Sequence, residues 1–242
     1  MSCTDSNVLP VAPKAATAAA AVTTPAIDSV AAAYGLPRIN EPAPAFQAQT
    51  TFGPRSLDDY RGKWLVLFSH PADFTPVCTT EFTAFAKASA DFSAINCELL
   101  GLSIDSIFSH LAWVQNIKEK FGVEIPFPII EDLSMNVARA YGMIHPGASD
   151  TAAVRATFII DPNGILRAMV YYPMTNGRSV AEILRLVRGL QTSLSQGVAT
   201  PEGWQPGDKV LVGAPKTVAE LDARLNEGLE TTDWYFSMKQ GG

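Results

Sequence analysis

A strand leads into a helix within Ser69-His70-Pro71-Ala72-Asp73-Phe74-Thr75-Pro76-Val77-Cys78-Thr79-Thr80-Glu81-Phe82, and a single cysteine stands just past the junction. The residues before it, 64–68, are continuously apolar, as in a buried strand, and residues 81–92 are apolar at helical spacing. Thr75 suits the N-cap of that helix, and Pro76 suits its first position, where the missing N–H costs nothing. The pattern therefore predicts Cys78 in the first helical turn, with its sulfur on the same side as the Thr75 hydroxyl.

This position favours a reactive cysteine. Unpaired N–H groups and the positive end of the helix dipole stabilise an anion at the first turn. A free thiol is only about 3% ionised at pH 7, so complete ionisation gains roughly 30-fold in rate, or about 2 kcal/mol. A fast reaction needs more, because charge also develops on the group that is attacked. Thr75 and a distant arginine are the candidates for stabilising that charge.

The motif Pro71-x-x-x-Thr75-x-x-Cys78 resembles the signature of the peroxiredoxins. Four further stretches resemble the one-cysteine, peroxiredoxin-6-like branch: residues 102–106, 110–113, 125–130 and 172–178. The resemblance covers residues 38–242. It implies a thioredoxin fold and a thiol-dependent peroxidase that uses neither a cofactor nor a metal.

The same resemblance assigns roles to individual residues. Cys78 would attack hydrogen peroxide or an alkyl hydroperoxide and become a sulfenic acid, while Thr75 and Arg155 bind and polarise the peroxide. Arg155 stands in the strand-like run 154–160, and Arg178 matches a second family arginine near the pocket. From the sequence alone, Arg155 either faces the cysteine or simply pairs with a carboxylate such as Glu81.

Three more residues of the opening stretch are candidates for the pocket. His70 either hydrogen-bonds the thiol or an incoming reductant, or packs at the base of the loop. Pro71 is expected to fix φ so that the loop excludes water beside the sulfur. Glu81 either orients Arg155 or only complements the helix dipole.

Composition excludes several classes of protein. The net charge of −6 and the lack of a basic cluster argue against nucleic-acid binding, and no apolar run approaches the ~18 residues of a membrane span. Cys3, Cys78 and Cys97 are too few for a disulfide framework, which indicates a reducing, cytoplasmic setting. His110 and His145 have no ligand partner at a short spacing, so no metal site is predicted.

The chain divides into three parts. Residues 1–37 are rich in alanine and are expected to be a disordered extension rather than a cleaved signal, because no basic cluster precedes the apolar run 15–22. Residues 38–197 alternate strands and helices and predict an α/β peroxidase domain with a mixed central sheet flanked by helices. Residues 198–242 predict a small C-terminal dimerisation arm.

Two local sequence signals predict the secondary structure in the second half of the α/β domain. The turn at 161–164, Asp-Pro-Asn-Gly, lies between strand-like runs and predicts a hairpin. Ser179 and Glu182 form a capping-box pattern ahead of an amphipathic helix. The sheet is therefore expected to be mixed, with that helix closing the core.

The C-terminal part supports predictions about the oligomeric state and about which thiol reduces Cys78. Its aromatic residues are expected to contact a partner subunit, in a homodimer that can assemble into a ring; they are Trp204, Trp234, Tyr235 and Phe236. Some relatives keep resolving cysteines in this segment, where this chain has Thr231, Thr232 and Ser237. The pattern predicts that an external thiol reduces Cys78.

The alternatives come from other classes. The same cysteine would serve a holdase chaperone or a redox sensor, which sustained peroxide consumption would distinguish from an enzyme. A thiol hydrolase using His110 or His145 has no supporting motif, and a disulfide oxidoreductase lacks its Cys-x-x-Cys. The phospholipase motif of some relatives, Gly-Asp-Ser-Trp, is replaced here by residues 60–64, Tyr-Arg-Gly-Lys-Trp.

Overall fold

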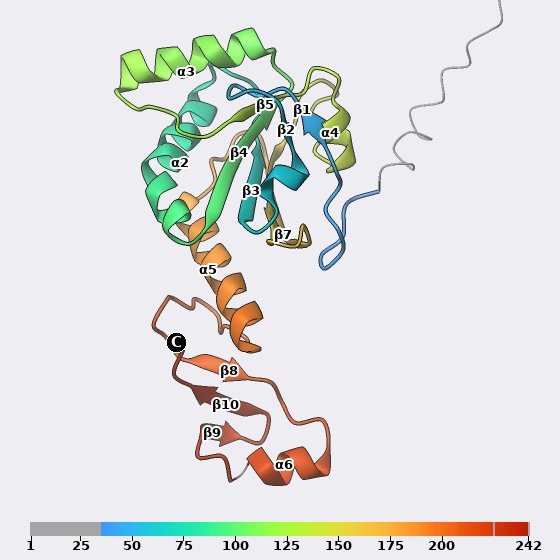
Figure 1. Ribbon diagram of the computed structural model, residues 1–242, viewed down its shortest axis with the longest axis vertical. Helices are drawn as coiled ribbons and strands as arrows, with labels where there is room; N and C mark the ends of the chain where they lie inside the picture. The colour runs from blue at the N-terminus through green and yellow to red at the C-terminus, as the bar shows by residue number, and fades with distance from the viewer. Residues whose placement is uncertain (1–34, 225, 242) are drawn as a thin grey trace, which may run out of the picture. The chain divides into compact units, whose positions relative to one another are not determined.

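A computed structural model of the protein describes residues 35–224 and 226–241 (Figure 1). The predictions for the alanine-rich residues 1–34 therefore lie outside the described residues, as does Cys3. No helix in the described part of the chain is long and apolar enough to cross a membrane.

A five-stranded sheet in the order β5-β4-β3-β6-β7 forms the centre of the α/β domain (Figure 1). The parallel strands are β3 (Trp64–Ser69), β4 (Cys97–Ser103) and β5 (Ile129–Glu131). The antiparallel half is β6 (Arg155–Ile160) and β7 (Leu166–Tyr172), with β6 paired to β3. The predicted α/β class and mixed sheet are confirmed.

Strand β3 is central because both of its faces are buried. Every residue of the strand is buried. Val66 and Phe68 join one hydrophobic cluster, whereas Leu65 and Leu67 join the cluster on the other face. Burial on both faces explains why this strand reads as a continuous apolar run rather than an alternating one.

Four α-helices and one 3-10 helix accompany the sheet in this domain. They are η1 (Leu57–Tyr60), α2 (Pro76–Ala94), α3 (Ile107–Phe121), α4 (Asn136–Ala140) and α5 (Val180–Gln196). The predicted cap of α5 is half formed. Ser179 accepts from the backbone N–H of Glu182, but the Glu182 carboxylate pairs with Arg185 at 2.6 Å instead of returning to the cap. An adjacent arginine competes successfully for that carboxylate.

The predicted hairpin joins β6 to β7. Asp161 Oδ1 accepts from the backbone N–H groups of Asn163 and Ile165, and Gly164 adopts a left-handed φ of +74°. A side-chain acceptor at the first turn position and a glycine at the fourth are what the sequence pattern requires. The antiparallel pairing of β6 with β3 brings Arg155, at the start of β6, next to the end of β3. A second, two-stranded pairing joins β1 (Gln47–Ala48) to β2 (Arg55–Ser56).

The residues after α5 are more regular than the sequence indicates. They form β8 (Val210–Val212), α6 (Val218–Arg224), β9 (Glu230–Asp233) and β10 (Phe236–Lys239), with the sheet order β8-β10-β9. Thr231 and Ser237 face each other across β9 and β10, and their hydroxyl oxygens are 2.9 Å apart.

The aromatic residues of this segment divide into two groups. Trp204 is buried, and its indole N–H donates to the carbonyl of Asp208. The expectation that Trp204 contacts a partner is therefore wrong: it packs within its own chain, as the nearby Gly189 and Thr200 allow. Trp234 and Tyr235 are 49% and 54% exposed and remain available for a partner.

Candidate active site

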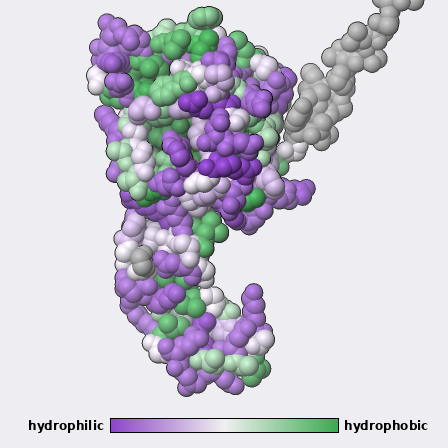
Figure 2. All heavy atoms as spheres, in the orientation of Figure 1, coloured by the Kyte–Doolittle hydropathy of each residue, from purple (hydrophilic) through white to green (hydrophobic). Residues whose placement is uncertain are grey.

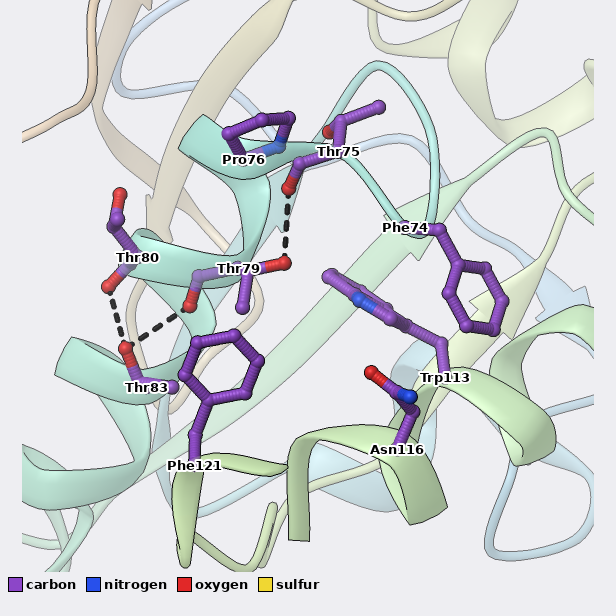
Figure 3. Close-up of a pocket in the computed structure, with 9 residues that line it drawn as sticks. All are labelled: Phe74, Thr75, Pro76, Thr79, Thr80, Thr83, Trp113, Asn116 and Phe121. Carbon is purple, nitrogen blue, oxygen red and sulfur yellow. Dashed lines mark hydrogen bonds between the residues drawn. The ribbon is translucent and has the colours of Figure 1, made fainter. Parts of the chain in front are cut away.

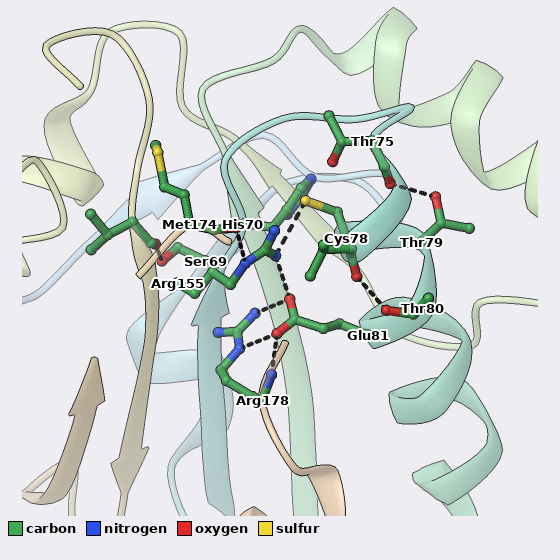
Figure 4. Close-up of polar contacts among 12 residues, drawn as sticks. Ser69, His70, Thr75, Cys78, Thr79, Thr80, Glu81, Arg155, Met174 and Arg178 are labelled. Carbon is green, nitrogen blue, oxygen red and sulfur yellow. Dashed lines mark hydrogen bonds and ion pairs between the residues drawn. The ribbon is translucent and has the colours of Figure 1, made fainter. Parts of the chain in front are cut away.

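Cys78 is the third residue of α2 and is fully buried (Figure 4). Thr75 is the N-cap, with extended backbone, and Pro76 occupies the first helical position, as predicted. The Thr75 hydroxyl does not cap the helix, however. It donates to the carbonyl of Ala72 at 2.9 Å, which leaves the N–H groups of the first turn without a side-chain cap.

Arg155 reaches the cysteine from β6, the strand next to β3. Its Nη1 lies 3.4 Å from Cys78 Sγ and 2.7 Å from Glu81 Oε2, and its Nε donates to the carbonyl of Met174 at 2.9 Å. The two alternatives that the sequence left open for Arg155 therefore hold together. Glu81 lies one helical turn after Cys78, so its carboxylate holds the guanidinium against the sulfur.

Arg178 completes this cluster from the segment before α5. Its Nε and Nη2 bind the two Glu81 oxygens at 2.9 and 2.8 Å, and its backbone N–H donates to Glu81 Oε1 at 2.7 Å. Its Nη1 donates to the carbonyl of Ala156 at 2.8 Å. No hydrogen bond joins Arg178 to Cys78 in the described structure, so it contacts the carboxylate and not the sulfur.

The charge of this cluster is unbalanced. Arg155, Arg178 and Glu81 are almost completely buried, and together they carry two positive charges and one negative charge. Burial alone would raise the pKa of Glu81, but its hydrogen bonds with Arg178 and the charges of both arginines hold that pKa below its usual range. One buried positive charge is left over, beside the Cys78 sulfur.

His70 lies at the end of β3, where it is fully buried. Its ring stacks on Trp113 with centroids 5.1 Å apart and meets Phe82 edge-on at 4.7 Å. Its Nε2 lies 2.8 Å from Asp73 Oδ1, and no hydrogen bond to Cys78 is formed. The packing alternative for His70 is thus realised.

The loop between His70 and α2 is tightly constrained. Pro71 is partly buried and has no N–H to offer. Phe74 adopts a left-handed φ of +55°, which is unfavourable for a bulky residue. The residue is also 55% exposed, although it is large and apolar. Asp73 anchors the loop because its backbone N–H donates to Asp105 Oδ2 at 2.9 Å.

A groove of about 460 Å³ lies on the other side of the first turns of α2 (Figure 3). Phe74 and Phe121 border it, with Trp113 and Asn116 from α3 and a row of threonines from α2. Figure 2 shows hydrophobic residues gathered over the α3 end of the domain, where Phe108 is 79% exposed. Cys78 does not line this groove, whereas Thr75 and Pro76 do.

Sequence reasoning missed Asp73 and the contact that it makes with His110. His110 is buried, with Nδ1 at 2.8 Å from Asp73 Oδ2 and Nε2 at 3.1 Å from the carbonyl of Ile130. Its partner lies 37 residues upstream, so a search for short ligand spacings overlooks it. The available signal was Asp73 itself, a carboxylate three residues after His70 in a loop leading to the cysteine.

His70, Asp73 and Asp105 are the described residues with the geometry for a metal ion, since their ligand atoms lie within 4.8 Å of one another. The two carboxylates are already engaged: both Asp73 oxygens face imidazole nitrogens, and Asp105 Oδ2 accepts from Ser103 at 2.7 Å. His70 Nδ1, in contrast, has no hydrogen-bond partner among the described residues.

Comparisons with known proteins agree with this geometry. The AhpC/TSA family matches residues 39–169, and the C-terminal domain of 1-Cys peroxiredoxin matches residues 189–228. A peroxiredoxin of Aquifex aeolicus is 59% identical over 216 residues, which cover 85% of this chain and 97% of that protein. A peroxiredoxin of Methanosarcina mazei is 49% identical over 215 residues, with coverages of 85% and 98%.

Solved structures give the same result. A yeast mitochondrial 1-Cys peroxiredoxin superposes with a TM-score of 0.75 at 40% identity, over 84% of this chain and 99% of that one. A cysteine-to-serine mutant of peroxiredoxin 6 of Arenicola marina also has a TM-score of 0.75, at 34% identity and with coverages of 85% and 98%.

The fold is therefore the thioredoxin fold of thiol peroxidases. The chain belongs to the AhpC/TSA family and is a peroxiredoxin with a 1-Cys-type C-terminal domain. It is an oxidoreductase that reduces peroxides through a peroxidatic cysteine, with thiols as the reductant. Family membership favours turnover over the chaperone and sensor alternatives.

Proposed function

We propose that Cys78 is the peroxidatic cysteine, and that it reduces hydrogen peroxide and alkyl hydroperoxides. Its thiolate attacks the terminal peroxide oxygen, so that an S–O bond forms as the O–O bond breaks. Cys78 becomes a sulfenic acid, and the leaving oxygen takes a proton from solvent to become water or an alcohol. The observation that supports this most directly is the Arg155 guanidinium 3.4 Å from Sγ at the start of α2.

The other site residues support that step. Arg155 and Thr75 bind and polarise the peroxide, which stabilises the charge that develops on the leaving oxygen. Glu81 and Arg178 hold Arg155 in place through the bonds described above. Pro71 shapes the loop and excludes water from the sulfur.

Reduction of the sulfenic acid is assigned to an external thiol. Cys97 is buried, and burial raises its pKa well above the usual range, which makes it a poor nucleophile. Cys3 lies in the part of the chain that is not described. Without a resolving thiol, excess peroxide drives Cys78 on to sulfinic and sulfonic acids, and the enzyme loses activity.

The assembly is proposed to be a homodimer, able to form a ring, in which residues 198–242 act as an arm on the peroxidase domain 38–197 of the neighbour. The arm's exposed Trp234 and Tyr235 support this, as does α6, in which no side chain described is buried. Cytoplasmic location is proposed from the sparse cysteines. The yeast 1-Cys structure is mitochondrial, so cell fractionation is the test.

The decisive experiment compares Cys78→Ser with the matched control Cys97→Ala. Peroxide loss is followed with thioredoxin, glutathione and ascorbate supplied separately, and folding is followed by circular dichroism. We expect Cys78→Ser to lose activity by on the order of 10⁴-fold while staying folded, because the substitution removes only the nucleophile. Cys97→Ala should retain turnover. Sustained turnover by Cys78→Ser would refute the assignment.

The arm is tested by ending the chain after Gln196. We expect a smaller species by light scattering and slower peroxide kinetics, because the neighbour's pocket loses its cover. A truncated protein with unchanged mass and unchanged kinetics would show that the arm is an appendage without a role in assembly. Trp234→Ala is the milder companion variant, since the residue is 49% exposed and its ring packs edge-on against Tyr235.

A further inference from the structure

The loop between β7 and α5 holds both arginines of the candidate active site. The Met174 carbonyl accepts from Arg155 Nε at 2.9 Å, and the backbone N–H of Arg178 donates to Glu81 Oε1 at 2.7 Å (Figure 4). Residues 175–177 are all that separates these two anchor points along the chain. A change in the length of the main chain within residues 175–177 therefore moves the backbone that fixes both arginines.

This short segment contains an asparagine followed by a glycine, Asn176-Gly177. Asparagine is one of the thermolabile residues of proteins. In an Asn-Gly pair the backbone nitrogen of the glycine attacks the side-chain amide carbon, since glycine has no Cβ to block the approach. A C–N bond forms, ammonia leaves, and the product is a cyclic succinimide. Water then opens the ring at either carbonyl and gives aspartate or isoaspartate.

The structure leaves the reacting groups of this pair accessible. Asn176 and Gly177 are both exposed. In the described part of the chain no hydrogen bond engages the Gly177 N–H, so the nitrogen that must attack is not held by another group. The Thr175 hydroxyl donates to Asn176 Oδ1 at 2.7 Å. A donor on the amide oxygen stabilises the negative charge that develops there when the amide carbon is attacked.

A second Asn-Gly pair in the same domain has the opposite arrangement. Asn163-Gly164 lies in the turn between β6 and β7, where Gly164 is buried and adopts a left-handed φ of +74°. The Gly164 N–H donates to the carbonyl of Asp161 at 2.8 Å, and Arg61 donates to the Asn163 carbonyl. Its attacking nitrogen is therefore engaged, and the backbone around it is held. The same dipeptide is fixed in one loop and accessible in the other.

We propose that Asn176 is a site of spontaneous deamidation, and that isoaspartate at this position displaces Arg155 and Arg178 and lowers peroxidase activity. The reaction consumes one water and releases one ammonia, so it needs neither an oxidant nor a second enzyme. The deamidation itself is independent of the proposed role of Cys78, whereas its effect on activity rests on that role.

The effect on the site follows from where the extra atom goes. Isoaspartate adds one carbon to the main chain between residues 176 and 177. Gly177 lies against α2, because a Cβ on it would be 3.4 Å from Val77 Cγ1 and 3.8 Å from Glu81 Cγ. The longer main chain has little room on that side. It therefore shifts the Met174 carbonyl or the Arg178 N–H away from its partner.

The first test measures the modification by mass. The whole protein is aged in mildly alkaline buffer under argon with a reductant and then digested with trypsin, which places the two asparagines in separate peptides, 156–167 and 168–178. We expect Asn176 to deamidate about tenfold faster than Asn163, the order expected when one nitrogen must first break a hydrogen bond. In urea the two rates should converge. Equal rates in the folded protein would overturn the proposal, whatever the activity of Cys78.

The second test measures what the product does. Electron-transfer fragmentation of peptide 168–178 gives the isoaspartate fraction of the aged protein, and stopped flow gives its reaction with hydrogen peroxide. We expect a slow phase whose amplitude equals that fraction. Its rate constant should be about 10²-fold below that of fresh protein, the order for a displacement of about 1 Å at a catalytic group. A sample rich in isoaspartate without a slow phase would overturn the effect on activity.

Two variants of Asn176 separate the causes. Asn176→Gln keeps an amide whose longer side chain closes the ring far less readily, so we expect full activity that ageing does not lower. Asn176→Asp adds only the charge, and at an exposed position this should change the rate constant less than about fivefold. Fresh Asn176→Asp with the full slowing of aged protein would overturn the role of the longer main chain. Ageing of Asn176→Gln at the unmodified protein's rate would overturn the assignment to Asn176.

Discussion

Two polar clusters meet at the start of α2, and they differ in what they leave unpaired. In the first, the Glu81 carboxylate pairs with both Arg155 and Arg178, so one of the two positive charges is not balanced. In the second, the Asp73 carboxylate contacts both His70 and His110, and His70 Nδ1 is left without a hydrogen-bond partner among the described residues. Both use a single buried carboxylate between two nitrogen bases. The difference is that guanidinium groups can only donate, whereas a neutral imidazole keeps one acceptor.

The contrast shows how a small site can serve both ends of one bond. A reacting peroxide needs stabilisation of the oxygen that leaves and orientation of the oxygen that is transferred. The unpaired positive charge beside Cys78 suits the first need.

Glu81→Gln tests the first cluster most severely. The variant leaves two buried guanidinium groups without the carboxylate that pairs them, and breaking a buried ion pair in this way costs about 3–5 kcal/mol. We expect a corresponding fall in the free energy of unfolding in urea. Glu182→Gln is the matched control, because its carboxylate pairs with Arg185 at the surface and its loss should cost less than about 1 kcal/mol. Equal effects of the two variants would show that the buried cluster does not stabilise the domain.

Arg155→Ala should lower the rate constant for hydrogen peroxide more than it lowers the free energy of unfolding. We expect a fall of about 10²-fold in the rate constant for hydrogen peroxide, comparable to removal of one oxyanion donor. The fall should persist at high pH, where the thiol is ionised without help. Stopped-flow measurements across the pH range check this, with Arg167→Ala as a control arginine of β7. Complete rescue at high pH would restrict Arg155 to promoting ionisation.

The second cluster predicts a weaker, pH-dependent effect on stability. His70 and Asp73 both have folded-state pKa values below their usual ones, so the unfolded chain binds more protons in acid. The stability from His70 is complete above pH ~6.5 and falls as the pH drops below it. That from Asp73 falls below pH ~4. Urea midpoints from pH 8 to 4 should decline with a step near pH 6 that His70→Phe removes; a flat profile would contradict the assignment.

Much of the first cluster could be predicted from the sequence, because its signals are local. Thr75, Pro76 and Cys78 follow from helix-start chemistry, and Glu81 lies one turn along the same helix. The pairing of β6 with β3 brings Arg155 near the cysteine. Only the Thr75 hydroxyl departs from the expected helix cap, because it donates to the Ala72 carbonyl instead.

The second cluster could not be predicted, because its members meet only in three dimensions. His110 and Asp73 lie in different elements, and their juxtaposition depends on how α3 packs over the loop. A lone histidine with no ligand partner at a short spacing gives no sign of a carboxylate 37 residues upstream. The burial of Trp204 was missed for a related reason. It depends on α5, which lies before it in the chain.

The facing hydroxyl groups of Thr231 and Ser237 have a consequence for the last hairpin. Two cysteines at these positions could form a cross-strand disulfide with its own reduction potential. The fraction oxidised would then depend on the glutathione redox couple around the protein. Two hydroxyl groups 2.9 Å apart make the same cross-strand contact without that property. The hairpin therefore has no thiol pair that could be oxidised to a cross-strand disulfide.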